Sequence, residues 1–197
     1  DAEVLRDTAL AVGGQLVEQP GGKGVKPYHR SGLWRAVGYS GSNTVQFVQD
    51  HGSNLFRRSL YTFWKRTGPA PVMMALDASK RDVCRAKREI TATPLQALVL
   101  MNGPQFVEAA RRLGEVMVRQ HGDNIQSIVR DTFRTLTSRE PSGREVALLQ
   151  QLHDEQLAHF EKDAKATDAF LGAGASPEPS GVGKPRGAAA RVLAKAV

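Results

Sequence analysis

The residues with the clearest chemical potential form a run of cations between residues 55 and 91. This segment holds nine Lys and Arg residues and three Asp and Glu residues, and nine minus three leaves six of the seven net positive charges of the chain. Guanidinium groups bind phosphate, sulfate or carboxylate through paired hydrogen bonds. The segment therefore predicts contact with an anionic group. The candidate anion-binding or interdomain residues are Arg57, Arg58, Tyr61, Lys65, Arg66, Arg85, Lys87 and Arg88.

Several anionic partners remain open for these cations. They can pair with carboxylates of the same chain and hold loops in place, or dock onto other domains of the same protein. They can also bind an anionic ligand such as an acidic polysaccharide. Nucleic acid is disfavoured, because Phe56, Phe63 and Trp64 fall on the opposite face of the predicted helix and are poorly placed to stack bases. The internal carboxylates available for pairing are Asp50, Asp77, Asp82 and Glu89.

No catalytic residue and no metal site is predicted. His153 and His159 are six residues apart, which places them on different faces of a helix. The loop that begins at Gly21 lacks the Gly-Lys-Ser/Thr ending of a phosphate-binding loop, and no nucleophile motif is present. Cys84 is the single cysteine, so a disulfide within the chain and c-type haem attachment are excluded. We expect Cys84 to be a small buried residue on a helix.

The elements that must position these residues are predicted to be helices. Apolar residues recur at helical spacing over residues 2–12, 54–66 and 104–120, and a capping pattern favours a helix over 79–88. Thr93-Pro94-Leu95-Gln96 is a capping box with Pro at the first helical position, and the following helix is apolar nearly all round. We therefore place this helix at the centre of the core. Two further helices are predicted from the boxes at Asp123 and Ser142, the second continuing to about residue 171.

These patterns predict an all-α fold, a multi-helix bundle with a long irregular amino-terminal loop. One helical domain is expected over residues 1–171, followed by a Gly/Pro/Ala-rich tail at 172–197 that we expect to be disordered. No apolar run approaches the roughly 20 residues of a transmembrane helix. The first residues lack the order of a signal peptide and open within a helical pattern, so we expect the chain to begin inside a longer protein.

Three long segments carry a resemblance to a known family. These segments resemble the carboxy-terminal domain of DUF1553 proteins, also called PSD1. They are LFRRSLYTFWKRT (55–67), LDASKRDVCRAKRE (76–89) and TPLQALVLMNGPQFVEAAR (93–111). The opening DAEVLRDTALAVGG and the loop GGKGVKPYHRSGLW resemble the segment that precedes it. The chain departs from the family at Ser53-Asn54, where an acidic pair is common, at Ile90-Thr91-Ala92, where Arg-Thr-Asn is common, and in its tail.

The resemblance implies a setting and leaves the reaction open. Proteins of this kind are large, are found mostly in planctomycetes and related bacteria, and often carry an export signal, a DUF1549 domain and a cytochrome c-like domain. It therefore implies a periplasmic or cell-surface location, and any haem c would belong to another domain. The family supplies no catalytic residues to transfer. The sequence favours a structural or interdomain interaction module, with a cleft for anionic polysaccharide coupled to a haem domain as the alternative.

Overall fold

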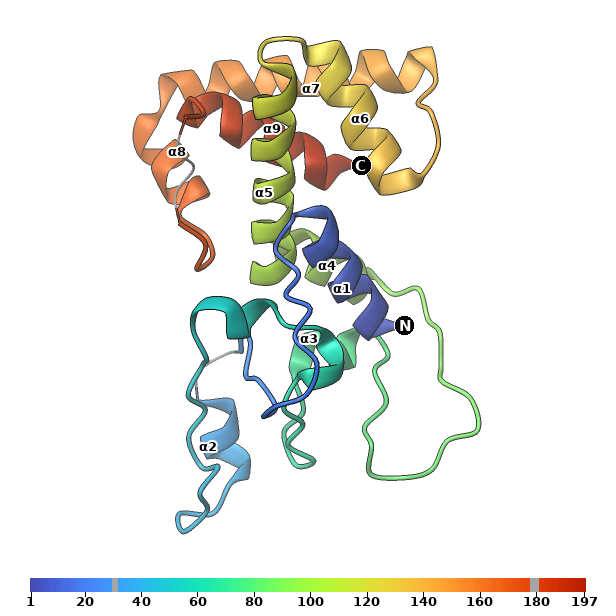
Figure 1. The fold of residues 1–197 in the computed structure, drawn as a ribbon, viewed down its shortest axis with the longest axis vertical. Helices are drawn as coiled ribbons and strands as arrows, with labels where there is room; N and C mark the ends of the chain where they lie inside the picture. Colours follow the sequence, from blue (N-terminus) through green and yellow to red (C-terminus); the bar gives the residue numbers. More distant parts are fainter. Residues whose placement is uncertain (30–31, 178–180) are drawn as a thin grey trace. The chain divides into compact units, whose positions relative to one another are not determined.

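The computed structural model describes residues 1–29, 32–177 and 181–197, and these ranges contain nine α-helices and no strand (Figure 1). The all-α class is confirmed. The chain divides into two compact units. The first consists of residues 1–8 and 16–103, and the second of residues 9–15 and 104–197. The expectation of a single domain over 1–171 therefore differs from the observed division, which separates the chain after Gly103.

The first unit is mostly irregular and is held by short elements. It contains the start of α1 (Ala2–Val12), then α2 (Leu33–Val37), α3 (Pro71–Ala75) and α4 (Pro94–Asn102), with two short 3-10 helices at Gly52–Phe56 and Ser59–Tyr61. Two isolated parallel bridges, Val17 with Arg57 and Val25 with Thr62, tie its amino-terminal loop to the middle of the unit. Its buried apolar residues are Ala2, Val25, Trp34, Leu55, Met73, Leu76 and Ala78.

The predicted helix over 54–66 is wrong, because its carbonyl groups are bonded to other segments. The backbone N–H of Val17 donates to Phe56 O at 3.0 Å, and that of Val25 donates to Tyr61 O at 2.8 Å. Arg57, which has an extended backbone, and Arg58 separate the two 3-10 helices. Pairing with the amino-terminal loop thus replaces the internal hydrogen bonds of an α-helix, and tertiary structure overrides the local apolar pattern.

The predicted helix over 79–88 is also wrong. Figure 1 shows the segment between α3 and α4 as an open loop (green), and Arg81 has a positive φ of 59°. Cys84 lies in this loop and is exposed, so its expected burial on a helix is wrong as well. Arginine and lysine side chains that prefer water leave this sequence little apolar surface to bury as a helix.

The capping box before α4 is confirmed, and the expected place of α4 in the core is wrong. Thr93 Oγ1 accepts from Gln96 N at 3.3 Å, and Gln96 Oε1 accepts from Thr93 N at 3.2 Å. However, no residue of α4 is buried. A helix that is apolar all round normally lies inside a protein.

The second unit is a bundle of α5 (Pro104–His121), α6 (Ile125–Thr137), α7 (Gly143–Lys162), α8 (Ala164–Leu171) and α9 (Lys184–Ala196). Ser142 and Glu145 form the predicted box before α7, while Asn124 replaces Asp123 as the cap of α6. The predicted continuation of α7 to residue 171 is wrong. The Asp163 side chain accepts from Ala166 N at 2.9 Å and starts α8 as a separate helix.

The expected disorder of the tail is wrong for residues 184–196, which form α9. In Figure 1 α9 (red) lies among α5, α6, α7 and α8, and its residues Ala188, Ala189 and Ala190 are at most 1% exposed. A Cβ atom on Gly114 of α5 would come within 2.9 Å of the α9 backbone. Small residues on both helices permit this close packing, so a composition typical of disorder here fills a core. Residues 178–180 of the tail lie outside the described residues.

Candidate functional site

Arg57 is buried and fastens a loop of its own chain. Its side chain, 3% exposed, donates to Gln19 O at 2.8 Å, to Lys23 O at 3.0 Å and to Gly21 O. The guanidinium stacks on the Tyr61 ring at 4.1 Å, and Tyr61 Oη accepts from Gly21 N at 2.8 Å. Two of the predicted site residues are therefore brought together, but around backbone groups of the glycine-rich loop instead of a ligand.

Arg6 is a second buried arginine, which the sequence reasoning missed. It donates to Leu55 O at 2.7 Å, to Arg57 O at 2.8 Å and to Ser59 Oγ at 3.1 Å. Burial lowers the pKa of Arg6 to about 10, opposed by the nearby Asp7 carboxylate. A signal was present in the sequence: Ala2, Arg6 and Leu10 recur every four residues on one face of α1, and all three are buried.

Other cations of the basic segment pair with the acidic residues of α1. Arg58 Nε lies 3.4 Å from Asp7 Oδ2, and Arg88 donates to Glu3 Oε2 at 2.6 Å. Arg81 also approaches Glu3, at 3.9 Å. Burial alone would raise the pKa of Glu3, but the Arg88 hydrogen bond, helped by backbone and charge interactions, lowers it below the ordinary value. Internal pairing thus occurs, mainly with carboxylates that the sequence analysis did not consider.

Two of the carboxylates expected to pair with the arginines, Asp50 and Asp77, accept hydrogen bonds from other groups instead. Asp50 accepts from Lys26 N at 2.7 Å, and Asp77 accepts from the backbone and hydroxyl of Thr91 and from Gln96. The Thr91 and Gln96 hydrogen bonds keep the pKa of Asp77 below its usual value. Among the expected carboxylates, Glu89 does pair with an arginine, since Arg85 Nη1 lies 3.0 Å from its Oε1.

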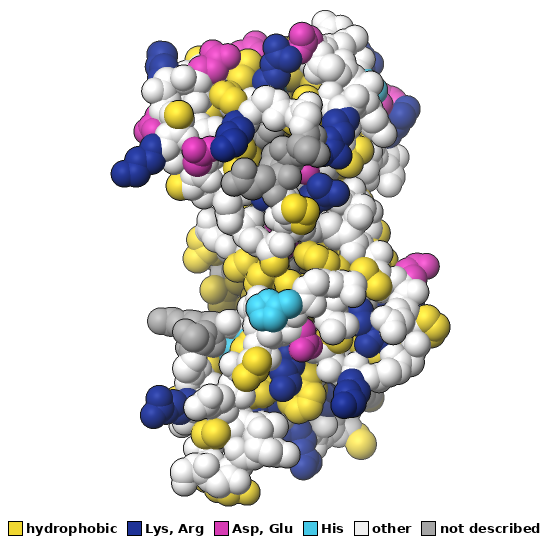
Figure 2. Space-filling model, turned by 60° about the vertical axis from the view of Figure 1, so that its left-hand side comes forward, with side chains coloured by type: hydrophobic (Ala, Val, Ile, Leu, Met, Phe, Trp, Pro, Cys, Tyr) yellow, Lys and Arg dark blue, Asp and Glu magenta, His cyan; other side chains and the backbone are white. Residues whose placement is uncertain are grey.

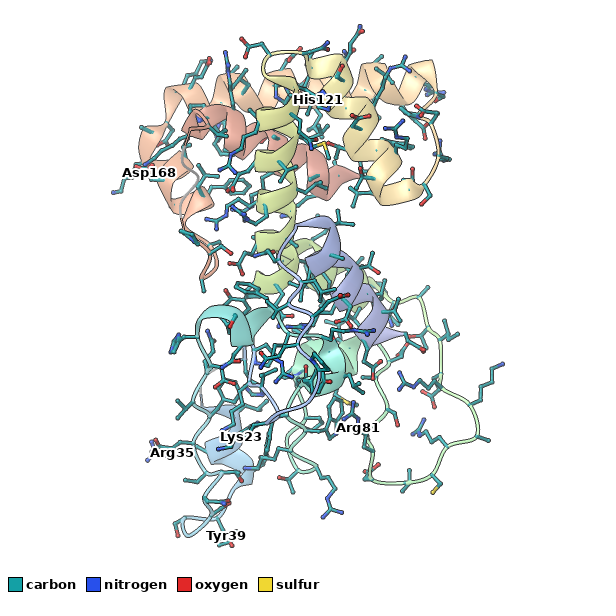
Figure 3. All side chains as sticks on the ribbon, in the orientation of Figure 1. Lys23, Arg35, Tyr39, Arg81, His121 and Asp168 are labelled. Atoms are coloured by element: carbon teal, nitrogen blue, oxygen red, sulfur yellow. The ribbon has the colours of Figure 1, made fainter. Side chains whose placement is uncertain are left out.

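The eight predicted residues do not form one patch. Lys65 donates to Thr44 O at 2.7 Å and lies over the Trp34 ring, while Arg66 and Lys87 are exposed. On the face that Figure 2 shows, Lys and Arg side chains are dispersed among other types. Lys23 and Arg81, labelled in Figure 3, belong to two different loops of the first unit.

One small pocket does gather cations. It has a volume of about 100 Å³, and Lys80, Arg85 and Arg88 line it together with Asp77 and Glu89. The two carboxylates reduce its positive charge, and both arginines already have carboxylate partners. The pocket is therefore polar and of mixed charge, and it suits a small group with both donors and acceptors.

Beside this pocket lies an apolar surface that the list of predicted site residues omitted. Leu95, Leu98 and Met101 of α4 are 55–56% exposed, and Ile90 in the preceding loop is 84% exposed. A second pocket of about 120 Å³ opens between α1 and α4, and Leu5, Ile90 and Leu100 line it. Soluble domains rarely expose apolar side chains in such a cluster unless it serves an interaction.

The second unit contains a buried charged cluster that holds the tail. Arg111 donates to Leu171 O at 2.7 Å and to Ser176 O at 2.9 Å, and Glu108 accepts from Ala175 N at 3.0 Å. Glu115 is fully buried and pairs with Arg112 at 2.8 Å. This cluster satisfies the backbone of residues 171–176, which explains why a polar tail can pack against α5.

Within the described ranges, no group of three or more His, Cys, Asp or Glu side chains is arranged to hold a metal ion. The two histidines with acidic neighbours form simple pairs, His121 with Asp131 at 2.8 Å and His153 with Asp154 at 3.2 Å. None of the helices in those ranges has the length and apolar content that a bilayer crossing requires.

Comparison with known proteins then decides the family. A family model described as PSD1, protein of unknown function (DUF1553), matches residues 1–153. The chain belongs to the DUF1553 family. The DUF1553 match contains the whole first unit, with its arginine contacts and α4, and ends within α7. No curated protein and no solved structure matches the chain. The resemblance inferred from the sequence is confirmed, and because DUF1553 has no assigned function it adds no catalytic residue.

Proposed function

We propose that this DUF1553 domain is a non-catalytic helical interaction module of a larger exported protein, and that its first unit docks onto other domains of that protein. The observation that carries the proposal is that arginines of the basic segment, residues 55–91, contact groups of their own unit. Arg57 binds backbone carbonyls, and Arg58 and Arg88 pair with Asp7 and Glu3 of α1. These contacts stabilise the first unit itself, which supports a structural or interaction role for the basic segment.

The exposed apolar residues support docking. α4 has complete capping and an apolar composition, but leaves Leu95, Leu98 and Met101 in solvent. Fully burying a leucine or methionine side chain stabilises a complex or a fold by roughly 1.5–3 kcal/mol. Binding of a partner that covers this surface would therefore be favourable. Without such a partner, burying α4 inside the domain would be the more stable arrangement.

Lysine footprinting tests the proposal. The accessible amines of Lys80 and Lys87 are acetylated in intact cells that make the full protein, and again in the purified chain. We expect labelling of both residues to fall several-fold in cells, because a docked domain excludes the reagent. Lys165 of α8, exposed in the second unit, is the control and should label equally in both samples. Equal labelling of Lys80 and Lys87 in the two samples would contradict docking.

A binding cleft for anionic polysaccharide, coupled to a haem domain elsewhere in the protein, is the second candidate. The pocket that Lys80, Arg85 and Arg88 line favours it. Binding to the native state would raise the melting temperature. A rise with a sulfated or carboxylated glycan that Lys80→Ala abolishes, without loss of fold, would support the cleft. A melting temperature unchanged across such a panel would reject it and leave the interaction module.

A further inference from the structure

We infer that the first unit binds an acidic amphipathic helix of its protein partner, with α4 contacting the apolar face and the loop at residues 79–92 contacting the acidic flank. This inference rests on the proposed docking function and specifies the chemistry of the partner. Three features of the first unit carry it: the exposed stripe of α4, a pocket at its edge and the charge of the neighbouring loop.

The exposed stripe of α4 has the geometry of a helix-packing surface. Leu95, Leu98 and Met101 recur every three residues, so their side chains lie along one face of the helix. All three are more than half exposed. Rows of side chains at this spacing pack into the grooves of a second helix. A partner helix that presents residues at i, i+3, i+4 and i+7 would cover the stripe.

The pocket beside α4 can receive one anchoring side chain. Its volume is about 120 Å³, and its apolar wall consists of Leu5, Leu76, Ile90 and Leu100. A single leucine or methionine of the partner fits a space of this size. Recognition by an amphipathic helix commonly uses such an anchor inserted into a preformed apolar pocket.

The loop supplies the charge preference. Residues 79–92 contain five Lys and Arg residues against two Asp and Glu residues, and five minus two gives +3. Among the described residues, no carboxylate pairs with Lys80 or Lys87. The backbone of residues 79–92 forms no hydrogen bond with the backbone of another described segment. Asp77 connects loop and helix, because its carboxylate accepts from both Thr91 and Gln96. The end of the loop is thus held at the start of α4, and the positive charge of the loop favours Glu and Asp on a helix bound there.

The same charges favour a protein over a lipid surface. Asp1, Asp77 and Glu89 line the apolar pocket, and a uniformly anionic membrane would be repelled there. α4 itself has no Lys, Arg, Trp or Tyr to anchor it among headgroups. A helix can place acidic residues opposite the loop and neutral or basic residues opposite these carboxylates, which a bilayer cannot do.

A pair of synthetic helices tests the inference with the intact chain of 197 residues. Both peptides have about 20 residues with leucine on one face, and the flanking positions are Glu in one peptide and Lys in the other. Fluorescence anisotropy measures binding of each peptide to the chain. We expect the Glu peptide to bind at least about tenfold more tightly, which corresponds to about 1.4 kcal/mol. We also expect its affinity to fall as salt is added.

Matched substitutions locate the site. Leu98→Glu places a like charge on the stripe and should weaken binding of the Glu peptide at least about tenfold. Leu148→Glu is the control, because Leu148 is 66% exposed on α7 of the second unit and should leave affinity unchanged. Lys87→Glu should reduce the preference for the Glu peptide. Circular dichroism verifies that each variant is folded.

Several results would overturn the inference. Equal affinity for the two peptides would remove the charge preference, and equal effects of the two leucine substitutions would remove α4 from the site. Binding to phosphatidylserine vesicles but to neither peptide would assign the surface to lipid, and self-association lost in Leu98→Glu would assign it to a second copy. If neither peptide binds but Lys80 and Lys87 are still protected from acetylation in cells, the acidic helix is rejected and the docking function is retained.

Discussion

Replacing Arg6 by Met should unfold the first unit far more readily than the same change at Arg58. Arg6 is 2% exposed and donates to Leu55 O, Arg57 O and Ser59 Oγ. Methionine keeps much of the volume but leaves these acceptors buried without a donor. Each hydrogen bond from a charged group contributes about 1.5–3 kcal/mol, and each orphaned acceptor costs about 1–3 kcal/mol.

These contributions are not additive, since removing the guanidinium also removes the cost of burying its charge. Breaking a buried hydrogen-bond network is nevertheless among the substitutions with large effects, and we expect a loss of about 3 kcal/mol for Arg6→Met. Arg58 is the matched control: its side chain is 56% exposed and it pairs with Asp7 at 3.4 Å. Exposed pairs contribute about 0–1 kcal/mol, so Arg58→Met should be nearly neutral.

Tryptophan fluorescence during urea unfolding measures this difference in the right part of the molecule. Both tryptophans, Trp34 and Trp64, belong to the first unit. With a denaturant slope of about 1–3 kcal/mol per molar urea, a loss of 3 kcal/mol lowers the midpoint by about 1–3 M. A shift for Arg6→Met no larger than that for Arg58→Met would refute the view that Arg6 fastens the unit through its hydrogen bonds.

Other predictions concern the second unit. Hydrogen bonds from Arg139 and from the backbone and side chain of Ser142 lower the pKa of Glu145 from 4.5 to about 2. The stability that ionised Glu145 contributes is therefore complete above pH 4.5 and is lost as the pH falls toward 2. NMR titration should find the pKa of this carboxyl closer to its ordinary value in Arg139→Ala. Gly114→Ala should cost about 1–3 kcal/mol, because the added methyl meets the α9 backbone. Gly143→Ala, where a Cβ meets no atom within 4 Å, should be neutral or stabilising, as thermal melts can show. Removing residues 172–197 should abolish the cooperative helical transition of this unit, which circular dichroism at 222 nm follows.

The sequence predicts the helices whose stability is local. Thr93 with Gln96, and Ser142 with Glu145, form complete capping boxes where the pattern placed them. The hydrogen bonds of such a box involve residues three apart, so no tertiary information is needed. The predicted start of α1 at Ala2 is also observed, and its end at Val12 before two glycines follows from the loss of helical preference there.

Prediction fails where distant segments bond to each other. The carbonyl groups of Phe56 and Tyr61 accept hydrogen bonds from a loop some forty residues earlier in the chain. No local sequence pattern reveals such a pairing. Arg57 was predicted on an exposed helical face and is buried, because three carbonyls of that loop converge on it. The tail fails for a similar reason: its alanines carry little apolar area of their own, but Gly114 allows them to approach α5 closely.

The two buried arginines of the first unit, Arg6 and Arg57, give part of the positive charge of a chain with pI near 9.9 a structural role. The first unit has few regular elements, so many backbone carbonyls lack a partner in a helix or sheet. An arginine supplies five donors in a fixed plane and satisfies several such carbonyls at once. Arg6 and Arg57 do this for the segments around Leu55 and Gly21. These two cations therefore stabilise the fold of the first unit, and the exposed Lys and Arg residues of the loop at 79–92 are the ones that can contact a partner.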